Sequence, residues 1–235
     1  MKQFMAPYVA IIHPADYRSI PFSEDDTFEK TYCVQLDEQC WLEIPLCALP
    51  GGQEAIALLM SNQSSFQVIE HLTTLMAQKA NLLRPDCIVA VPTMGLEYAS
   101  RIAQKLGHEH YVAMGFSQKF WYDEEMSEPV VSTTSPDQAK NLYIDPGLLT
   151  RVQGKRVVVV DDVINTGSSV SAVIRLLKKA GADVVGTVVT LTEGHEWEKT
   201  LAVPSIGASS QVVSLGHIPI FKRHGDVWVA RPETL

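Results

Sequence analysis

Short apolar runs alternate with helical periodicity between about residues 86 and 215. The runs are brief and continuous, as in buried parallel strands, and comprise Cys87–Val91, His110–Met114, Val157–Val160, Val184–Leu191 and Gln211–Leu215. Ser168–Ala180 is the clearest helix, because apolar residues recur at helical spacing from Val170 to Leu177. Gly95–Leu106 has a similar pattern. The alternation predicts the α/β class, with βαβ units forming a twisted, mostly parallel sheet flanked by helices.

The first third of the chain is less regular. Val9–Ile12, Thr31–Val34 and Trp41–Leu46 are expected to be short strands, and Gln67–Lys79 an amphipathic helix. A polar stretch without clear periodicity, residues 117–141, is expected to be a loop. A loop of that length inside a compact domain is usually functional or disordered.

Composition and charge narrow the class of protein. With 46% apolar and 20% charged residues, the 235-residue chain is expected to fold into a sizeable core. The net charge of −8 argues against a nucleic-acid-binding face, and no apolar run approaches the length of a membrane span. We expect no signal peptide. The four cysteines form no CxxC pair, so we expect them to be reduced residues of a cytoplasmic protein.

The strand at Val157–Val160 leads directly into the most informative segment. Two carboxylates, Asp161 and Asp162, are followed by small and hydroxyl residues that open the next helix: Asn165, Thr166, Gly167, Ser168 and Ser169. Free amides and the positive dipole end of a helix start favour an anion such as a phosphate. Adjacent aspartates would repel that phosphate unless a sugar diol donated hydrogen bonds to them. The segment therefore predicts a site for ribose 5-phosphate.

Other phosphate-binding loops fit this segment less well. A Walker loop requires Gly-Lys-Ser/Thr, and a dinucleotide-binding fingerprint requires G-x-G-x-x-G; neither pattern is present here. In a phosphoacceptor receiver domain the paired acids lie near the start of the domain and a further Asp follows at a later strand end. This sequence does not show that arrangement. The simplest alternative is an ordinary strand–helix turn that carries two solvated aspartates.

Residues 157–169 resemble the phosphoribosyl-pyrophosphate motif of the type I phosphoribosyltransferases: an apolar strand, two acids, two apolar residues, then Thr-Gly and small hydroxyl residues. Leu142–Asp145 and Lys155–Val157 are similar to segments of adenine phosphoribosyltransferases. The resemblance implies the type I phosphoribosyltransferase fold. Residues 1–60 would form a small N-terminal hood over the base, and residues 61–235 the core, with a flexible loop at 117–141. Phe221 is expected to pack on the core.

The resemblance also implies a second loop, which holds the diphosphate of phosphoribosyl pyrophosphate (PRPP). Its counterpart follows the first core strand and offers the amides of Thr93, Met94 and Gly95. Many family members carry Arg or Lys in this loop, whereas this chain does not. Lys119 is our candidate for the missing cation. Mg²⁺ would be bound through the diphosphate, with no metal site built from protein side chains.

The implied function is transfer of the 5-phosphoribosyl group from PRPP to a nitrogenous base, with an adenine-like purine favoured. Asp161 and Asp162 would be the catalytic residues. Hypoxanthine-guanine enzymes have an Asp at the position of Asn165, and a neutral Asn cannot act as a base there. The flexible-loop glutamate of adenine enzymes has no secure counterpart. A ligand sensor without catalysis, or a transferase acting on a pyrimidine or other acceptor, therefore stays open. The expected partners are PRPP, the base and a second copy of the chain in a homodimer.

Overall fold

The protein is described here by a computed structural model, which covers residues 7–17, 26–132, 135–207 and 211–235. Its core is a five-stranded sheet in the order β12-β11-β10-β6-β7, in which every neighbouring pair is parallel. The strands are β6 (Cys87–Ala90), β7 (Val112–Ala113), β10 (Arg156–Ile164), β11 (Asp183–Glu193) and β12 (Val212–Ile218). The predicted α/β class and mostly parallel sheet are confirmed.

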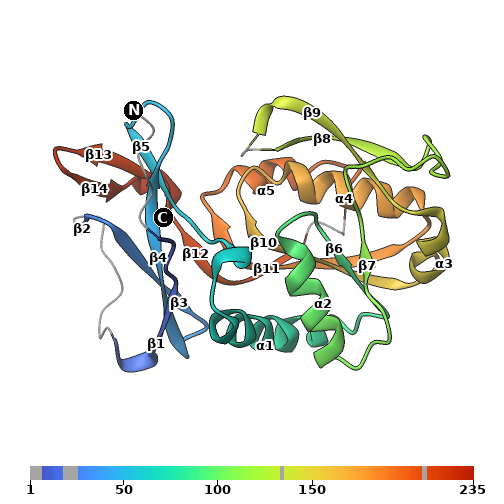
Figure 1. The fold of residues 1–235 in the computed structure, drawn as a ribbon, viewed down its shortest axis with the longest axis horizontal. Coiled ribbons are helices and arrows are strands. Elements are labelled where there is room, and N and C mark those ends of the chain that lie inside the picture. The colour runs from blue at the N-terminus through green and yellow to red at the C-terminus, as the bar shows by residue number, and fades with distance from the viewer. Residues whose placement is uncertain (1–6, 18–25, 133–134, 208–210) are drawn as a thin grey trace.

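Helices cover both faces of this sheet (Figure 1). α1 (Phe66–Leu82) and α2 (Gly95–Lys105) lie on one face, and α4 (Ser168–Lys179) lies on the other. Alternate residues of β10 point to opposite faces of the sheet. Val158 and Val160 pack with α1 and α2, whereas Val157 and Val159 pack with α4. This two-sided burial explains the continuous apolar run in the sequence.

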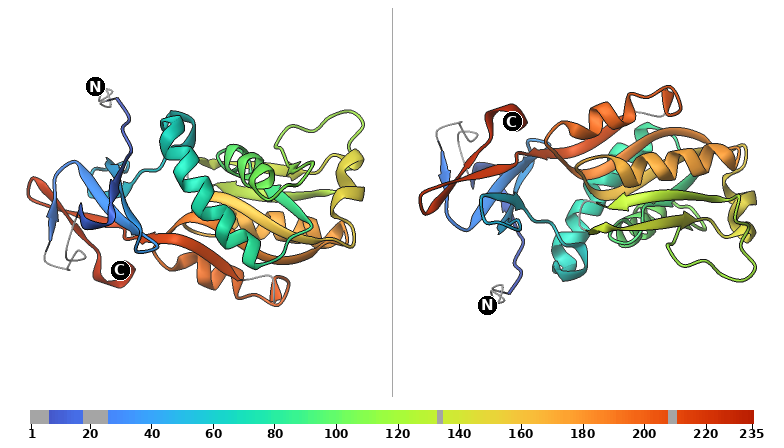
Figure 2. Two further views of the ribbon diagram at one scale, coloured as in Figure 1. Left: turned by 90° about the horizontal axis from the view of Figure 1, so that it is seen from below. Right: turned by 90° about the horizontal axis from the view of Figure 1, so that it is seen from above.

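A second, seven-stranded antiparallel sheet forms the hood, at one end of the core (Figures 1 and 2). Its strands are β1 (Ile11–Pro14), β2 (Thr27–Phe28), β3 (Thr31–Leu36), β4 (Cys40–Ala48), β5 (Glu54–Ala57), β13 (Phe221–His224) and β14 (Val227–Ala230). β13 pairs with β5, and β14 pairs with β2. The expected division into a hood of residues 1–60 and a core of residues 61–235 is therefore wrong at the C-terminus. Long-range pairing of this kind leaves no local signal in a single sequence.

Aromatic packing explains why the C-terminal hairpin joins the hood. The Phe221 side chain is fully buried, and its ring makes edge-to-face contacts with Phe28 and Tyr32 at centroid distances of 5.6 and 5.2 Å. Such contacts add to the free energy gained by burying the rings. The expectation that Phe221 packs in the interior is confirmed, and its partners belong to the hood.

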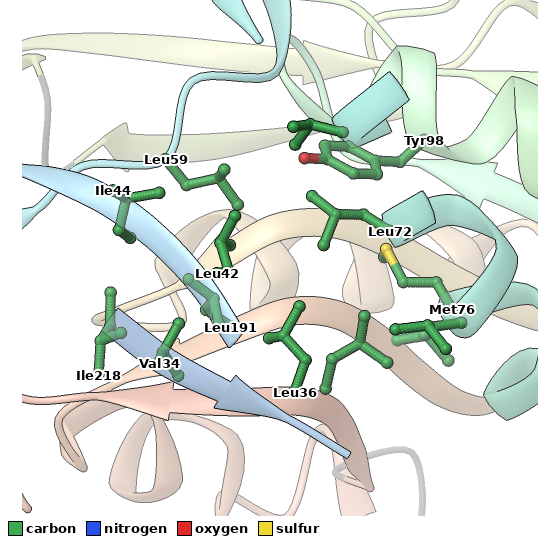
Figure 3. Close-up of a cluster of buried hydrophobic side chains, with 14 of the residues drawn as sticks. Val34, Leu36, Leu42, Ile44, Leu59, Leu72, Met76, Tyr98, Leu191 and Ile218 are labelled. Atoms are coloured by element: carbon green, nitrogen blue, oxygen red, sulfur yellow. The ribbon is translucent and has the colours of Figure 1, made fainter. Parts of the chain in front are cut away.

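Hood and core share one hydrophobic cluster (Figure 3). In it, hood residues such as Leu36 and Leu42 face Leu72 and Met76 of α1. The contact between the sheets is close: a Cβ on Gly216 of β12 would lie 2.8 Å from the Gln35 carbonyl oxygen. Only glycine fits at that position. The hood is thereby fixed against the core next to the carboxyl ends of its strands.

The segment expected to be a loop at residues 117–141 contains a β-hairpin. β8 (Ser127–Ser132) pairs antiparallel with β9 (Ser135–Tyr143), and β8 lies against α4. Glu128 of β8 is buried and forms ion pairs with Arg175 and Lys179 of α4, at 2.9 and 2.6 Å. The sequence did not predict these strands because they lack a clear apolar alternation. An ion-pair cluster, in addition to apolar side chains, holds them in place.

The remaining elements are short. They are the helices α3 (Leu149–Val152) and α5 (Glu196–Leu201), and 3₁₀ turns at Ala15–Tyr17, Ser61–Gln63, Pro146–Leu148 and Pro232–Thr234. Within the described ranges, no helix has the length and apolar character needed to span a bilayer.

Candidate functional site

Two loops meet at the carboxyl ends of the neighbouring strands β6 and β10. The Val91 amide donates a hydrogen bond to the Val160 carbonyl oxygen at 2.9 Å. A Cβ on Gly95 would lie 2.6 Å from that same oxygen and 3.2 Å from Oδ1 of Asp161. Gly95 is therefore required for the start of α2 to approach Asp161 so closely. Ligands of open α/β sheets bind at this edge, as the sequence predicted.

The aspartate pair lies inside β10, which runs on to Ile164 instead of ending at Val160 as predicted. Asp161 is only 8% exposed. Its Oδ1 accepts a hydrogen bond from the Asp162 amide at 2.9 Å, and Oδ1 of Asp162 accepts one from the Val163 amide at 2.8 Å. No ion pair involves either aspartate in the part of the chain that the structure describes.

Both carboxyl groups have a raised pKa. Burial is the largest cause, and for Asp161 the neighbouring Asp162 carboxylate adds to it. The pKa of Asp162 rises to about 6. Removal from water without a cation partner disfavours the charged form. The site therefore favours a ligand that donates hydrogen bonds or brings positive charge to the two aspartates.

The start of α4 lies where the sequence predicted a phosphate site, and its geometry suits an anion. Gly167 has a φ of 77° and a Cβ there would lie 3.2 Å from the Trp197 backbone, so the turn requires glycine. The Ser168 amide donates a hydrogen bond to Oγ1 of Thr166 at 3.4 Å. At Ser171 the amide donates to the carbonyl oxygen of Gly167, as in a regular helix. The amides between them have no acceptor within the helix and are available to an anion.

The second loop brings Thr93, Met94 and Gly95 to the same edge of the sheet. The peptide between Pro92 and Thr93 is cis, and the Met94 carbonyl accepts a hydrogen bond from Oγ of Ser61 at 3.3 Å. Lys119 is not brought into the site by any contact. It is exposed in the segment before β8, and no hydrogen bond or ion pair among the described residues connects its side chain with either loop.

Glu193, the last residue of β11, is a site residue that the sequence did not identify. It is 5% exposed, and the side-chain amide of Asn165 donates a hydrogen bond to its carboxylate. Burial raises its pKa to about 7. The register aligns Ile164 with Thr192, so β10 and β11 end side by side. The strand was expected to end at Leu191, which left Glu193 outside the predicted edge. A prediction that extended the strand to Glu193 would have placed this residue at the edge of the sheet.

Two tyrosines, Tyr8 and Tyr98, lie close enough to Asp162 for its charge to affect their pKa values. Tyr98 of α2 is fully buried, and Oη of Tyr8 accepts a hydrogen bond from the Met60 amide at 3.0 Å. Burial, and to a smaller degree the charge of Asp162, raises the pKa of both phenols. The segment before β1 therefore approaches the aspartate pair, although it lies more than 150 positions away in the sequence.

The fold and this arrangement agree with the comparison to known families. The sequence model described as "Phosphoribosyl transferase domain" matches residues 61–218, which include both loops and Glu193. The chain belongs to the phosphoribosyl transferase domain family. This confirms the family inferred from residues 157–169.

Individual relatives cover different functions. The chain is 29% identical over 128 residues to a hypoxanthine/guanine phosphoribosyltransferase of Methanobrevibacter ruminantium, covering 54% of this chain and 63% of that protein. It is 32% identical to an adenine phosphoribosyltransferase of Gluconacetobacter diazotrophicus, covering 57% and 70%. A probable purine biosynthesis transcriptional regulator PurR of Streptococcus pneumoniae is 23% identical, covering 71% and 61%.

Solved structures show the same fold. The adenine phosphoribosyltransferase of Leishmania donovani superposes with a TM-score of 0.54 at 21% identity, over 65% of this chain and 66% of that one. The expected type I phosphoribosyltransferase fold, with a hood beside the parallel sheet, is thus confirmed.

Proposed function

We propose that this protein transfers the 5-phosphoribosyl group from PRPP to a nitrogenous base, with release of diphosphate, and that a purine is the favoured acceptor. The observation that carries the proposal is a buried aspartate pair without a cation partner among the described residues, directly before a helix start with free amides. The relatives support a purine acceptor, since two of them are named for purine bases.

Each part of the site has a task in this reaction. Asp161 and Asp162 accept hydrogen bonds from the ribose 2- and 3-hydroxyl groups and stabilise positive charge that develops on the ribose ring. Asn165–Ser169 anchor the 5-phosphate, so that binding energy from a remote group positions C1. Thr93, Met94 and Gly95 offer amides to the diphosphate.

Mg²⁺ fits this arrangement as a companion of the substrate. Among the described residues no group of three or more His, Cys, Asp or Glu side chains is placed to hold a metal ion. Mg²⁺ is commonly bound through one or two carboxylates together with substrate phosphates. The diphosphate of PRPP would supply the oxygens that hold the ion, while the aspartate pair binds the ribose hydroxyl groups. When bound, the ion neutralises charge on the departing diphosphate.

A non-catalytic PRPP sensor is the second candidate. The PurR relative, whose match covers 71% of this chain, favours it. Such a protein would bind PRPP at the same residues and turn over no base. We further propose a homodimer and a cytoplasmic location; the free cysteines of the described residues suit a reducing compartment.

Turnover separates the two candidates. We expect the protein, mixed with PRPP, Mg²⁺ and a panel of purines, pyrimidines and orotate, to release diphosphate with at least one purine. Asp161→Asn combined with Asp162→Asn should abolish release, while circular dichroism shows an intact fold. Full activity in the double variant would contradict the site assignment. PRPP binding by calorimetry without turnover on any base would instead favour the sensor.

A further inference from the structure

In the proposed reaction the nitrogenous base loses a proton, which neither Asn165 nor the aspartate pair is free to accept. When a ring nitrogen of the base attacks C1, the electron pair of the C1–O bond leaves with the diphosphate, and the N–H proton of the base must go elsewhere. Asn165 has no basic group. The aspartate pair is occupied by the ribose hydroxyl groups. A separate base is required on the side from which the acceptor arrives.

The strand order defines that side. The sheet runs β12-β11-β10-β6-β7, with the diphosphate loop after β6 and the ribose phosphate loop after β10. A nucleophile approaches C1 from the side opposite the leaving group. Because the diphosphate lies toward β6, the acceptor enters over the carboxyl end of β11. The last residue of that strand is Glu193.

The side chain of Glu193 is held at this position. Asn165 is the first residue of the phosphate loop, and its amide donates to the Glu193 carboxylate. This bond orients the carboxyl group at the border of the ribose site. No ion pair in the described ranges involves Glu193, in contrast to the buried Glu128 with its two cations. Burying a charged carboxyl group without a cation costs free energy, and groups perturbed in this way cluster at functional sites.

We propose that Glu193 is the general base of the transfer, a proposal that rests on the phosphoribosyltransferase function given above. Its carboxylate accepts the N–H proton of the nitrogenous acceptor while the N–C1 bond forms and the C1–O bond to diphosphate breaks. The proton passes to solvent when the product leaves. Asn165 acts as a positioning residue, because it touches Glu193 and holds its carboxylate toward the acceptor.

The electrostatics suit this role. A base works best when its pKa lies near the pH at which the enzyme operates, and burial raises the pKa of Glu193 to about 7. The titratable groups on neighbouring elements are Asp161 and Asp162 of β10, His217 of β12 and His195 before α5. The two histidine rings stack on each other at 5.0 Å, and His217 bonds to Thr192.

The test is Glu193→Gln, which keeps the size of the side chain and the hydrogen bond from Asn165. We expect kcat to fall about 10²–10⁴-fold, the range for loss of a general base. The KM for PRPP should stay near its wild-type value. The rise of wild-type kcat with pH near 7 should be absent from the variant. Glu196→Gln is the matched control, because Glu196 is exposed on the adjacent helix and should leave both kinetics and pH profile unchanged.

The outcomes separate this proposal from the proposed function. Wild-type turnover with an equally active E193Q protein overturns the role of Glu193 alone. A fall in kcat that leaves the pH profile unchanged also overturns it, because a structural defect would act in that way. Absence of wild-type turnover on every base overturns the proposed function and, with it, this proposal. Normal PRPP binding by E193Q, measured by calorimetry, confirms that the variant is folded.

Discussion

At the scale of single residues, two glycines determine whether the site can form. Gly95 lets the first turn of α2 lie against Asp161, and Gly167 provides the left-handed turn that begins α4. A Cβ on Gly95 would collide with the Val160 carbonyl oxygen at 2.6 Å, whereas Gly167 is required by its φ of 77° and by the tight contact that a Cβ would make with Trp197. These two positions carry no functional group, yet the close packing of both proposed ligand loops depends on them.

Gly95→Ala should therefore damage both stability and ligand binding. The added methyl group would lie 2.6 Å from the Val160 carbonyl oxygen, and such overpacking costs about 1–3 kcal/mol. We expect a lower melting temperature and weaker PRPP binding by calorimetry. Gly115→Ala is the control, because a Cβ there meets no atom within 4 Å. Equal behaviour of the two variants would contradict the close approach of the loops.

At the scale of elements, the β8–β9 hairpin depends on α4. Glu128 is buried in β8, and burial alone would raise its pKa, but Lys179 and Arg175 outweigh that effect and lower it. Arg175 also donates to Oγ of Ser171 at 2.6 Å. The hairpin is thus tied through Glu128 to the same helix whose first turn is the proposed phosphate site.

Glu128→Gln tests this link. The variant keeps the shape of the side chain and removes the charge that two cations require, so we expect a loss of about 1–3 kcal/mol of unfolding free energy. Urea denaturation measures the loss, and limited proteolysis should cut the hairpin faster. Glu125→Gln, at an exposed position of the same segment, should match the wild type. If both glutamate variants were equally stable, the ion-pair cluster would not be what holds the hairpin.

At the scale of the whole molecule, hood and core form one folding unit. The large hydrophobic cluster extends from Phe28 and Phe221 in the hood to Ile88 and Val158 in the parallel sheet. A shared core means that neither sheet can lose its packing without exposing the other.

Phe221→Ala should destabilise the entire molecule. Removing a fully buried phenylalanine costs about 3–5 kcal/mol. We expect tryptophan fluorescence, to which Trp41 and Trp228 of the hood and Trp121 and Trp197 outside it contribute, to change in a single urea transition in which PRPP binding is also lost. Phe120→Ala, at a side chain that is 97% exposed, should leave the midpoint unchanged. Two separate transitions in F221A would show that hood and core unfold independently.

Much of the core was predictable because its signals are local. The apolar runs and the helix at Ser168 follow from periodicity within about a dozen residues, and the phosphate loop follows from a strand, a turn and a helix start in direct succession. The hairpin at 127–143 and the hood membership of Phe221 were not predictable. They depend on an ion-pair cluster with α4 and on strand pairing across more than 150 positions, which one sequence does not reveal.

The sequence alone predicted the proposed donor site from Asp161 to Ser169, because the aspartates, the tight turn and the helix start are neighbours along the chain. The proposed acceptor site could be found only in the tertiary structure. Asn165 and Glu193 are 28 positions apart and meet only because β10 and β11 are parallel neighbours with aligned carboxyl ends. The partner of Glu193 is defined only once the order of the strands in the sheet is set. That order depends on how all the apolar side chains of the core are buried together.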